Sequence, residues 1–229
     1  MTKSEELFEM FCTGIDLDFE RVTTESYRTP DYIVRLVETL LVVEVKQFDP
    51  SPTELHSLRK SPEEWDESDA FSQGLPGERV RAKIDSAMPQ LKRIADVSTP
   101  TLLVLYDNVQ LWPEICDAYA IAVAMNGLET ALISSEVAPE GGATILARWH
   151  GKSRRTTSNA NTTLSAIGVL SEKQGVLALS LYHNYFARNP IRPELLIFKN
   201  VRHFCLERNP ELSFSEWISW PYNPIQAME

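Results

Sequence analysis

Apolar and polar positions change their spacing along the chain, and each spacing predicts an element. Leu7, Phe8 and Phe11 form a helical stripe, with Ser4 as the expected N-cap and Gly14 as the expected stop. Alternating and continuous apolar runs follow, and they predict three strands, at residues 17–24, 31–37 and 40–48. The chain is therefore expected to open with one helix and three strands.

Helical and strand-like segments alternate again further along. Residues 49–77 contain prolines and acids without sustained periodicity, which predicts a long excursion with a short helical piece at 53–59. The next elements predicted are a helix at 78–94, a buried strand at 101–106 and a helix at 113–125. Four more strands are expected, at residues 128–134, 143–149, 163–170 and 176–182. This order predicts one α/β domain with a strand-rich second half.

Charge and cysteine content narrow the function classes. The chain has 22 Lys and Arg against 32 Asp and Glu, a net charge of −10, which excludes nucleic-acid binding through overall positive charge but not through a local basic groove. Cys12, Cys116 and Cys205 are odd in number and far apart, so they indicate buried small residues instead of a disulfide framework or zinc site. No apolar run suits a signal peptide or a membrane span, so we expect a cytoplasmic protein.

The expected strand at 40–48 carries two opposite charges on one face. Alternation places Val43 and Val45 on one side, and Val42, Glu44 and Lys46 on the other. Both sides begin apolar, as in a central strand covered on both faces. Because a buried charge is costly unless it is paired or binds a metal, the pattern indicates either a solvated Glu–Lys pair at a strand end or a functional site.

The preceding strand brings a third charged residue to this face. A tight hairpin with a two-residue loop would place Asp31 opposite Lys46, whereas a four-residue loop would place Asp31 opposite Glu44. Either register puts all three side chains on one face, with cross-strand neighbours about 5 Å apart. A slip of one residue would move Asp31 to the opposite face. Two carboxylates beside an ammonium suit a site for Mg²⁺, which favours oxygen ligands and can polarise a phosphodiester.

These residues resemble the signature of a known family. Pro30-Asp31 followed by Glu44-Val45-Lys46, in the order helix, three strands, helix, strand, resembles the PD-(D/E)XK nuclease superfamily. The resemblance covers residues 1–107 and implies a restriction-endonuclease-like core, a central mixed sheet flanked by helices. Residues 108–229 would then extend this core within the same domain.

The resemblance implies Mg²⁺-dependent hydrolysis of phosphodiester bonds, with Mn²⁺ as a substitute and DNA favoured over RNA. By position, Asp31, Glu44 and the backbone carbonyl of Val45 would ligate the metal, and Lys46 would lie beside the attacking water. An inactive PD-(D/E)XK-type module that binds or assembles within a larger complex is the alternative function. A homodimer is a further expected state, and a membrane is not an expected partner.

Several members of the superfamily carry another acid on the opening helix. Here Glu5 lies nearest the edge of the apolar stripe and is preferred over Glu9. For each acid the alternative is an ordinary first-turn carboxylate that complements the helix dipole. Alternation puts Gln47 on the opposite face from Lys46, away from catalysis.

Two basic segments are candidates for contact with nucleic acid. The first is the helix at 78–94 and the second is the stretch 148–155, next to a polar run that predicts a mobile loop. A solvated helix face and a plain exposed loop are the respective alternatives. The candidate side chains are Arg79, Arg81, Lys83, Gln90, Arg148, Lys152, Arg154 and Arg155.

The remaining polar features favour structural roles. Tyr182-His183-Asn184-Tyr185 follows an expected strand without a nucleophile pattern, which indicates a cap at the strand end. His56 and His203 are isolated and have no metal-binding spacing. The acidic stretch 63–69 indicates a solvated loop, with a phosphate-mimicking cover over the site as the alternative.

Overall fold

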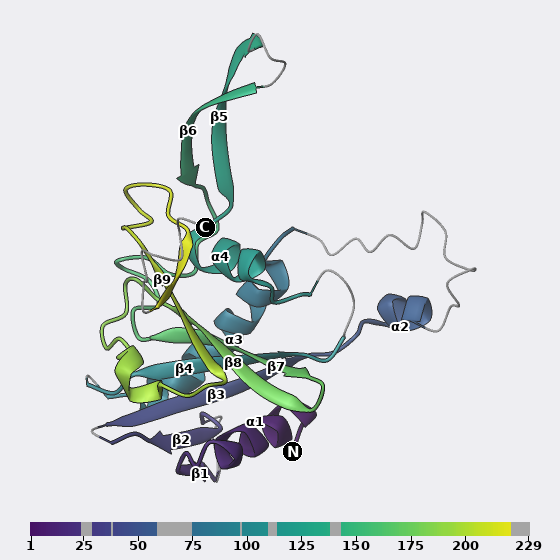
Figure 1. Ribbon diagram of the computed structural model, residues 1–229, viewed down its shortest axis with the longest axis vertical. Helices are drawn as coiled ribbons and strands as arrows, with labels where there is room; N and C mark the ends of the chain where they lie inside the picture. Colours follow the sequence, from purple (N-terminus) through teal and green to yellow (C-terminus); the bar gives the residue numbers. More distant parts are fainter. Residues whose placement is uncertain are drawn as a thin grey trace.

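An eight-stranded mixed sheet forms the centre of the protein (Figure 1). The computed structural model describes residues 1–23, 29–37, 39–58, 75–96, 98–109, 114–137 and 143–220. In spatial order the strands are β1 (Phe19–Arg21), β2 (Tyr32–Arg35), β3 (Leu40–Phe48), β4 (Thr101–Asp107), β7 (Ala166–Lys173), β8 (Val176–His183), β9 (Val201–Leu206) and β10 (Trp217–Trp220). The pairs β3–β4, β4–β7 and β8–β9 are parallel and the other pairs are antiparallel.

Helices lie on both faces of this sheet. Helix α1 (Lys3–Gly14) and the short 3₁₀ helix η3 (Pro193–Leu196) cover one face, and α3 (Glu78–Ile94) and α4 (Ala118–Asn126) cover the other. Helix α2 (Pro52–Leu58) lies in the excursion between β3 and α3, where the sequence predicts a short helical piece. The α/β class predicted from the sequence is therefore confirmed.

Strand β4 shows why the centre of the sheet is a continuous apolar run. Leu103 and Leu105 pack in the core under α3 and α4, whereas Leu102 and Val104 pack in the core under α1. None of these four side chains is more than 2% exposed. A strand covered on both faces has no polar side, so its sequence lacks alternation.

Helix α1 begins two residues earlier than the sequence predicts. Thr2, and not Ser4, is the N-cap, because the Thr2 side chain accepts from the backbone of Glu5 while the Glu5 side chain accepts from the backbone of Thr2. This reciprocal capping box satisfies two backbone donors that the start of the helix leaves open. Ser4 is instead buried, and its backbone N–H donates to the Gln47 side chain on the face of β3 that α1 covers.

Other boundaries depart from the pattern at the edges of the sheet. Strand β1 is three residues long, against an expected span of 17–24, and it pairs only with β2. Helix α4 begins at Ala118, where the Asp117 carboxylate caps it, and Pro113 lies outside the described residues. Strands β9 and β10 were not expected at all, because both are short and lack a strict apolar alternation.

A two-stranded antiparallel sheet of β5 (Glu129–Val137) and β6 (Ala143–His150) stands apart from the main sheet. Figure 1 shows these strands as a long hairpin that projects away from the body of the protein above α4. We call residues 129–137 and 143–150 the arm. No helix within the described ranges is long and apolar enough to cross a membrane.

Gly77 fits α3 tightly against α4, and Gly77→Ala is expected to destabilise the fold by about 2–4 kcal/mol. Its backbone has φ 71°, in the left-handed region. A Cβ atom there would lie 2.7 Å from the Ala120 carbonyl oxygen and 2.9 Å from the Ala124 nitrogen. Urea denaturation of the variant and the wild type would measure the loss.

Gly175→Ala is the matched control for this prediction. Gly175 has a similar φ of 75°, but a Cβ atom there meets nothing within 4 Å. Only the backbone strain remains, so we expect a loss of about 1 kcal/mol. Equal losses in the two variants would contradict the claim that close helix packing requires Gly77.

Candidate active site

Strand β3 turns two charged side chains toward α3. Val42 and Phe48 belong to the core under α3 and α4, and Val43 and Val45 belong to the core under α1. Alternation along the strand therefore puts Glu44 and Lys46 on the α3 side, as the sequence predicts. The two charges sit between apolar positions of one buried face.

The hairpin between β2 and β3 sets the place of Asp31. Tyr32 pairs with Val43 and Arg35 with Leu40, and this register continued by one residue places Asp31 opposite Glu44. The backbone N–H of Asp31 also donates to the Val43 carbonyl over 3.1 Å. Of the two registers that the sequence leaves open, this is the four-residue one. The two-residue loop is wrong.

The side chain of Asp31 is fixed by the backbone of β3. Its Oδ2 atom accepts a hydrogen bond of 2.8 Å from the Val45 N–H. Asp31 is half-buried, and it lies close enough to Lys46 and Glu5 for both charges to influence its ionisation. The carboxylate thus takes a fixed position at the end of β2.

Glu44 is completely buried. Its side chain has no exposed surface, and the Lys46 ammonium forms an ion pair with its Oε1 atom. Neither Glu44 oxygen accepts a hydrogen bond of ordinary geometry from the part of the chain that the structure describes. A carboxylate in this state is poorly stabilised, since a buried charge needs several partners to replace water.

Gln90 on α3 links the site to the helix. Lys46 Nζ donates to Gln90 Oε1 over 3.2 Å, and Gln90 Nε2 donates to the Thr29 carbonyl over 3.1 Å. The amide oxygen of Gln90 therefore binds the Lys46 ammonium, and its amide nitrogen binds the backbone just before β2. Among the candidates on this helix, Gln90 makes the most direct contact with the site.

The ionisation of both carboxyl groups reflects this environment. Burial raises the pKa of Glu44 to about 7; Lys46 opposes the rise, and the charge of Asp31 adds to it. Burial also raises the pKa of Asp31, against the Val45 hydrogen bond and Lys46. Two neighbouring carboxyl groups with raised pKa values favour either protons or a cation between them.

The donor set of the site fits a hard divalent cation. Asp31, Glu44 and the Val45 carbonyl offer only oxygen, and the unsatisfied oxygens of Glu44 are the atoms such an ion would stabilise. Mg²⁺ usually takes one or two protein carboxylates and keeps several waters. Over the described residues no cluster of three or more His, Cys, Asp or Glu side chains could hold a metal ion, so a third side-chain ligand is not in place.

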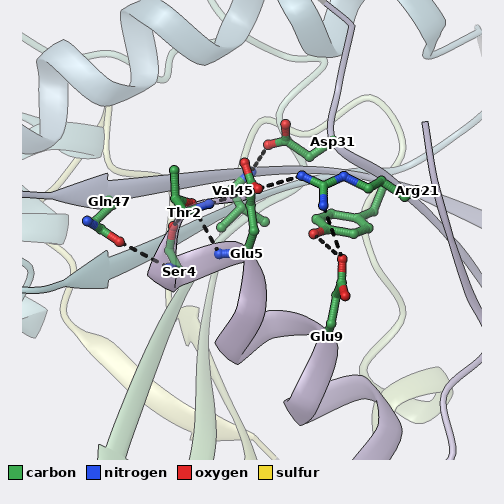
Figure 2. Close-up of polar contacts among 9 residues, drawn as sticks. Thr2, Ser4, Glu5, Glu9, Arg21, Asp31, Val45 and Gln47 are labelled. Atoms are coloured by element: carbon green, nitrogen blue, oxygen red, sulfur yellow. Dashed lines mark hydrogen bonds and ion pairs between the residues drawn. The ribbon is translucent and has the colours of Figure 1, made fainter. Parts of the chain in front are cut away.

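The acids of α1 are engaged by an arginine that the sequence did not single out. Figure 2 shows the Arg21 guanidinium reaching both Glu5 and Glu9, at 2.5 Å and 3.6 Å. Glu9 also accepts from the Tyr32 hydroxyl over 2.8 Å. Glu5 and Arg21 are both near enough to Asp31 to influence its pKa. Glu5 is thus the acid of α1 that flanks the site, but Arg21 binds it.

Two cations of α3 lie beside the site. Lys83 and Arg79 both lie over the Phe48 ring, 5.4 Å and 5.6 Å from its centroid. Burial and the nearby Lys46 ammonium lower the pKa of Lys83. Arg79 also pairs with Glu54 of α2. Lys83 extends the positive charge of Lys46 along β3, whereas the charge of Arg79 is shared with Glu54.

Arg81 is a wrong candidate for contact with nucleic acid. It is buried on another side of α3, where its guanidinium donates to the Pro76 carbonyl over 3.1 Å. Residues three or four positions apart share a face of a helix, as Arg79 and Lys83 do. Arg81 is two positions from each of them and therefore points in another direction. Its role is to hold the turn that precedes the helix.

The basic segment 148–155 does not flank the site. Arg148 pairs with Glu129 within the arm, and Arg155 makes a bidentate pair with Asp85, which faces away from Lys83 on α3. Arg154 donates to the His150 and Gly151 carbonyls, and Lys152 is exposed. The expected positive patch is therefore largely neutralised by acids and carbonyls.

The polar run after this segment is packed, and not a mobile loop. Thr156 is buried, and its hydroxyl and backbone N–H both donate to the Met125 carbonyl. Asn161 ties the same stretch to the Arg155 carbonyl over 2.8 Å. Polar residues here satisfy backbone groups at the end of α4 and within the segment itself, which explains a polar sequence in a packed segment.

Two other features are structural. Asn184 caps the end of β8 by donating to the Leu164 carbonyl over 2.7 Å, as expected. His203 is not isolated, because its Nδ1 lies 2.9 Å from His183 Nε2 across paired strands. Cys12 and Cys116 are buried free thiols, in agreement with their predicted role. The side chain of His56 and the acidic stretch 63–69 lie outside the described residues.

Comparison of the chain with protein-family models, with curated proteins and with solved structures gave no significant match. The site itself is therefore the basis on which a function can be proposed.

Proposed function

We propose that the protein is a Mg²⁺-dependent nuclease with a PD-(D/E)XK-type core. The observation that carries the proposal is the register of β2 against β3, which places Asp31 opposite Glu44 with Lys46 on the same face. The order α1, β1, β2, β3, α3, β4 is that of a restriction-endonuclease-like core, with α2 inserted before α3. The substrate class is nucleic acid, and DNA is the first substrate to test.

Each residue of the site has a distinct role in this proposal. Asp31, Glu44 and the Val45 carbonyl would hold the metal. Mg²⁺ would polarise the phosphodiester and lower the pKa of a bound water. Lys46 would orient the attacking water and stabilise the negative charge that develops on the phosphate. Gln90 would keep the Lys46 ammonium pointed at the site, through the hydrogen bond already described.

The cations of α3 would receive the substrate backbone. Lys83 and Arg79 continue from Lys46 along the α3 side of β3, where phosphates adjacent to the scissile bond would lie. Local positive charge of this kind is needed because the chain as a whole carries −10. Mn²⁺ is expected to substitute for Mg²⁺, since both accept oxygen ligands.

An inactive binding module is the second candidate, and one observation favours it. Glu44 has no exposed surface and is covered by Lys46, as in a structural ion pair within a core. In that case the acids and lysine would be retained only as part of the fold. The neighbouring Asp31 opposes this alternative, because its charge adds to the burial that raises the pKa of Glu44, and a structural Glu–Lys pair gains nothing from a second carboxylate.

A cleavage assay separates the two candidates. Labelled single-stranded and double-stranded DNA and RNA would be incubated with the protein and Mg²⁺, Mn²⁺ or a chelator. The nuclease proposal expects cleavage that requires the metal and stops in the chelator. If no substrate is cut with either metal, and calorimetry detects no Mg²⁺ or Mn²⁺ binding, the binding module replaces it.

Lys46→Ala is expected to lower the single-turnover cleavage rate at least about 100-fold while metal binding persists. The ammonium stabilises charge in the transition state and does not ligate a cation. Metal affinity is expected to stay equal or increase, because a neighbouring positive charge is removed. Quench-flow rates and Mn²⁺ titration would measure the two effects separately.

Lys173→Ala is the matched control, since this exposed lysine lies at the far end of β7. Its rate and metal affinity should equal those of the wild type. An active Lys46→Ala variant would rule out the proposed role of the ammonium, even if the protein cuts nucleic acid.

A further inference from the structure

The arm exposes large apolar side chains that the body of the protein does not cover. Leu132, Ile133, Ile145, Leu146 and Trp149 are between 42% and 61% exposed. Residues 144–149 are exposed without interruption, so both faces of β6 meet solvent. Among the described elements, β5 and β6 contact each other closely and other elements only sparsely.

Irregular pairing explains why apolar side chains emerge on both faces. The register of β5 against β6 shifts between Leu132 and Ile133, and again between Ile133 and Val137. Such irregularities twist a ribbon and break the alternation between an apolar face and a polar face. Beyond its foot, the arm therefore exposes apolar side chains to water on both faces in a free monomer.

A free two-stranded ribbon is also marginally stable in water. Three or more strands, or packing against another element, are usually needed for an independent sheet. The two strands of the arm form a sheet of their own, and among the described residues its foot packs on the body through Arg148 and His150 against Phe214. A second ribbon would supply both the missing strands and the apolar cover.

The charges of the arm favour an identical partner over nucleic acid. Its apolar stretches at 130–134 and 144–147 carry no charged residue, and Arg148 is paired with Glu129. A hairpin that enters nucleic acid needs free cations, which these stretches lack. Because two chains of net charge −10 repel each other elsewhere, they meet most easily through an uncharged surface.

The foot of the arm offers a socket that fits the outer part of a second arm. A cavity of about 210 Å³ lies between α4, the foot of the arm and the segment before β10. Its walls are largely apolar and aromatic, with Tyr119, Val123, Phe214 and Trp217. The Glu129–Arg148 ion pair and Glu216 also line it. Two ribbons related by a two-fold axis and running antiparallel bring the outer half of each arm to the foot of the other.

We propose that the protein forms a two-fold symmetric homodimer in which the arms of two copies pack against each other, with side chains of each outer arm against the partner's foot cavity. Five half-exposed apolar side chains per copy would bury, over the two copies together, on the order of 500–1,000 Å² of accessible surface. Backbone and small side chains between them extend this toward the roughly 1,200 Å² at which specific interfaces begin. This proposal goes beyond the nuclease activity and does not depend on it.

Sedimentation equilibrium of the full chain from about 1 to about 100 µM tests the dimer. The wild type should sediment as a dimer at the upper concentrations. Leu146→Glu should raise the dimer dissociation constant at least about tenfold, because it places a charge in the apolar contact. Ile133→Glu, on the other strand, should have the same effect, and circular dichroism would check that both variants remain folded.

Val176→Glu is the matched control. Val176 is 61% exposed, like Leu146, but it lies in the β7–β8 turn of the main sheet. Its dissociation constant should equal that of the wild type. A wild type that stays monomeric at about 100 µM overturns the proposal, and so does a dimer that both arm variants leave intact or that Val176→Glu weakens equally.

Discussion

Glu44→Gln and Asp31→Asn are each expected to lower metal-dependent cleavage at least about 1,000-fold and to abolish Mg²⁺ binding. Each change keeps the shape of the side chain and removes the negative charge that a cation requires. Among the residues that the structure describes, these two carboxylates have no third acid grouped with them that could hold a metal ion, so we expect neither loss to be compensated. Single-turnover rates and Mn²⁺ titration by electron paramagnetic resonance would measure both effects.

Asp18→Asn is the control for these two variants. Asp18 is an exposed acid that pairs with Arg35 at the edge of the sheet, so its neutralisation should leave cleavage unchanged. Cleavage that persists in Glu44→Gln at the wild-type rate would exclude the metal site at β3. Equal losses in all three variants would instead indicate a general effect of charge on substrate binding.

Glu44→Gln is also expected to stabilise the metal-free protein at alkaline pH, by up to about 3 kcal/mol. The folded-state pKa of Glu44 is about 7, above the ordinary value of 4.5. A group with a raised folded pKa contributes stability that is fully present below its unfolded pKa, and this contribution is lost as pH rises through the folded value. The wild type should therefore lose stability between about pH 5 and pH 8, and the variant should lose less.

Urea denaturation in chelator from pH 5 to pH 8 would measure this difference. At pH 5 the two proteins should be nearly equally stable, because Glu44 is then largely protonated in the folded state. Adding Mg²⁺ at pH 8 should stabilise the wild type and not the variant, since a ligand that binds only the folded state adds to its stability. A variant that is less stable than wild type at pH 8 without metal would show that the Glu44–Lys46 pair is a net stabilising contact.

The elements that the sequence predicts best are those with the strongest physical constraint. The bounds of β3 and α3 agree with their patterns, because each element packs a long apolar surface against the core. Strand β10 has four residues and β9 carries an arginine and a histidine, so their pairing depends on the neighbouring strands. Short strands at or next to the edge of a sheet, such as these two, have little intrinsic preference for the strand conformation.

The candidate site was predictable in its centre and less so in its surroundings. Alternation alone brings Glu44 and Lys46 together, and the hairpin adds Asp31. Arg21 could not be recognised, because only the pairing of β1 with β2 brings it to α1. The charge cluster at 148–155 was misread, because its partner Asp85 is 70 positions from Arg155 in the sequence.

The hydrogen bonds of Gln90 have a consequence for the order of folding. They join residues 44 and 61 positions apart, across the excursion that contains α2. Closing a loop of that length lowers the entropy of the chain before any stabilising contact has formed. The parallel pairing of β3 with β4 requires the same loop to close. The hairpin of β2 and β3 needs only a four-residue loop and can assemble early. Asp31, Glu44 and Lys46 therefore come together first, and they receive the support of α3 only when the central sheet closes.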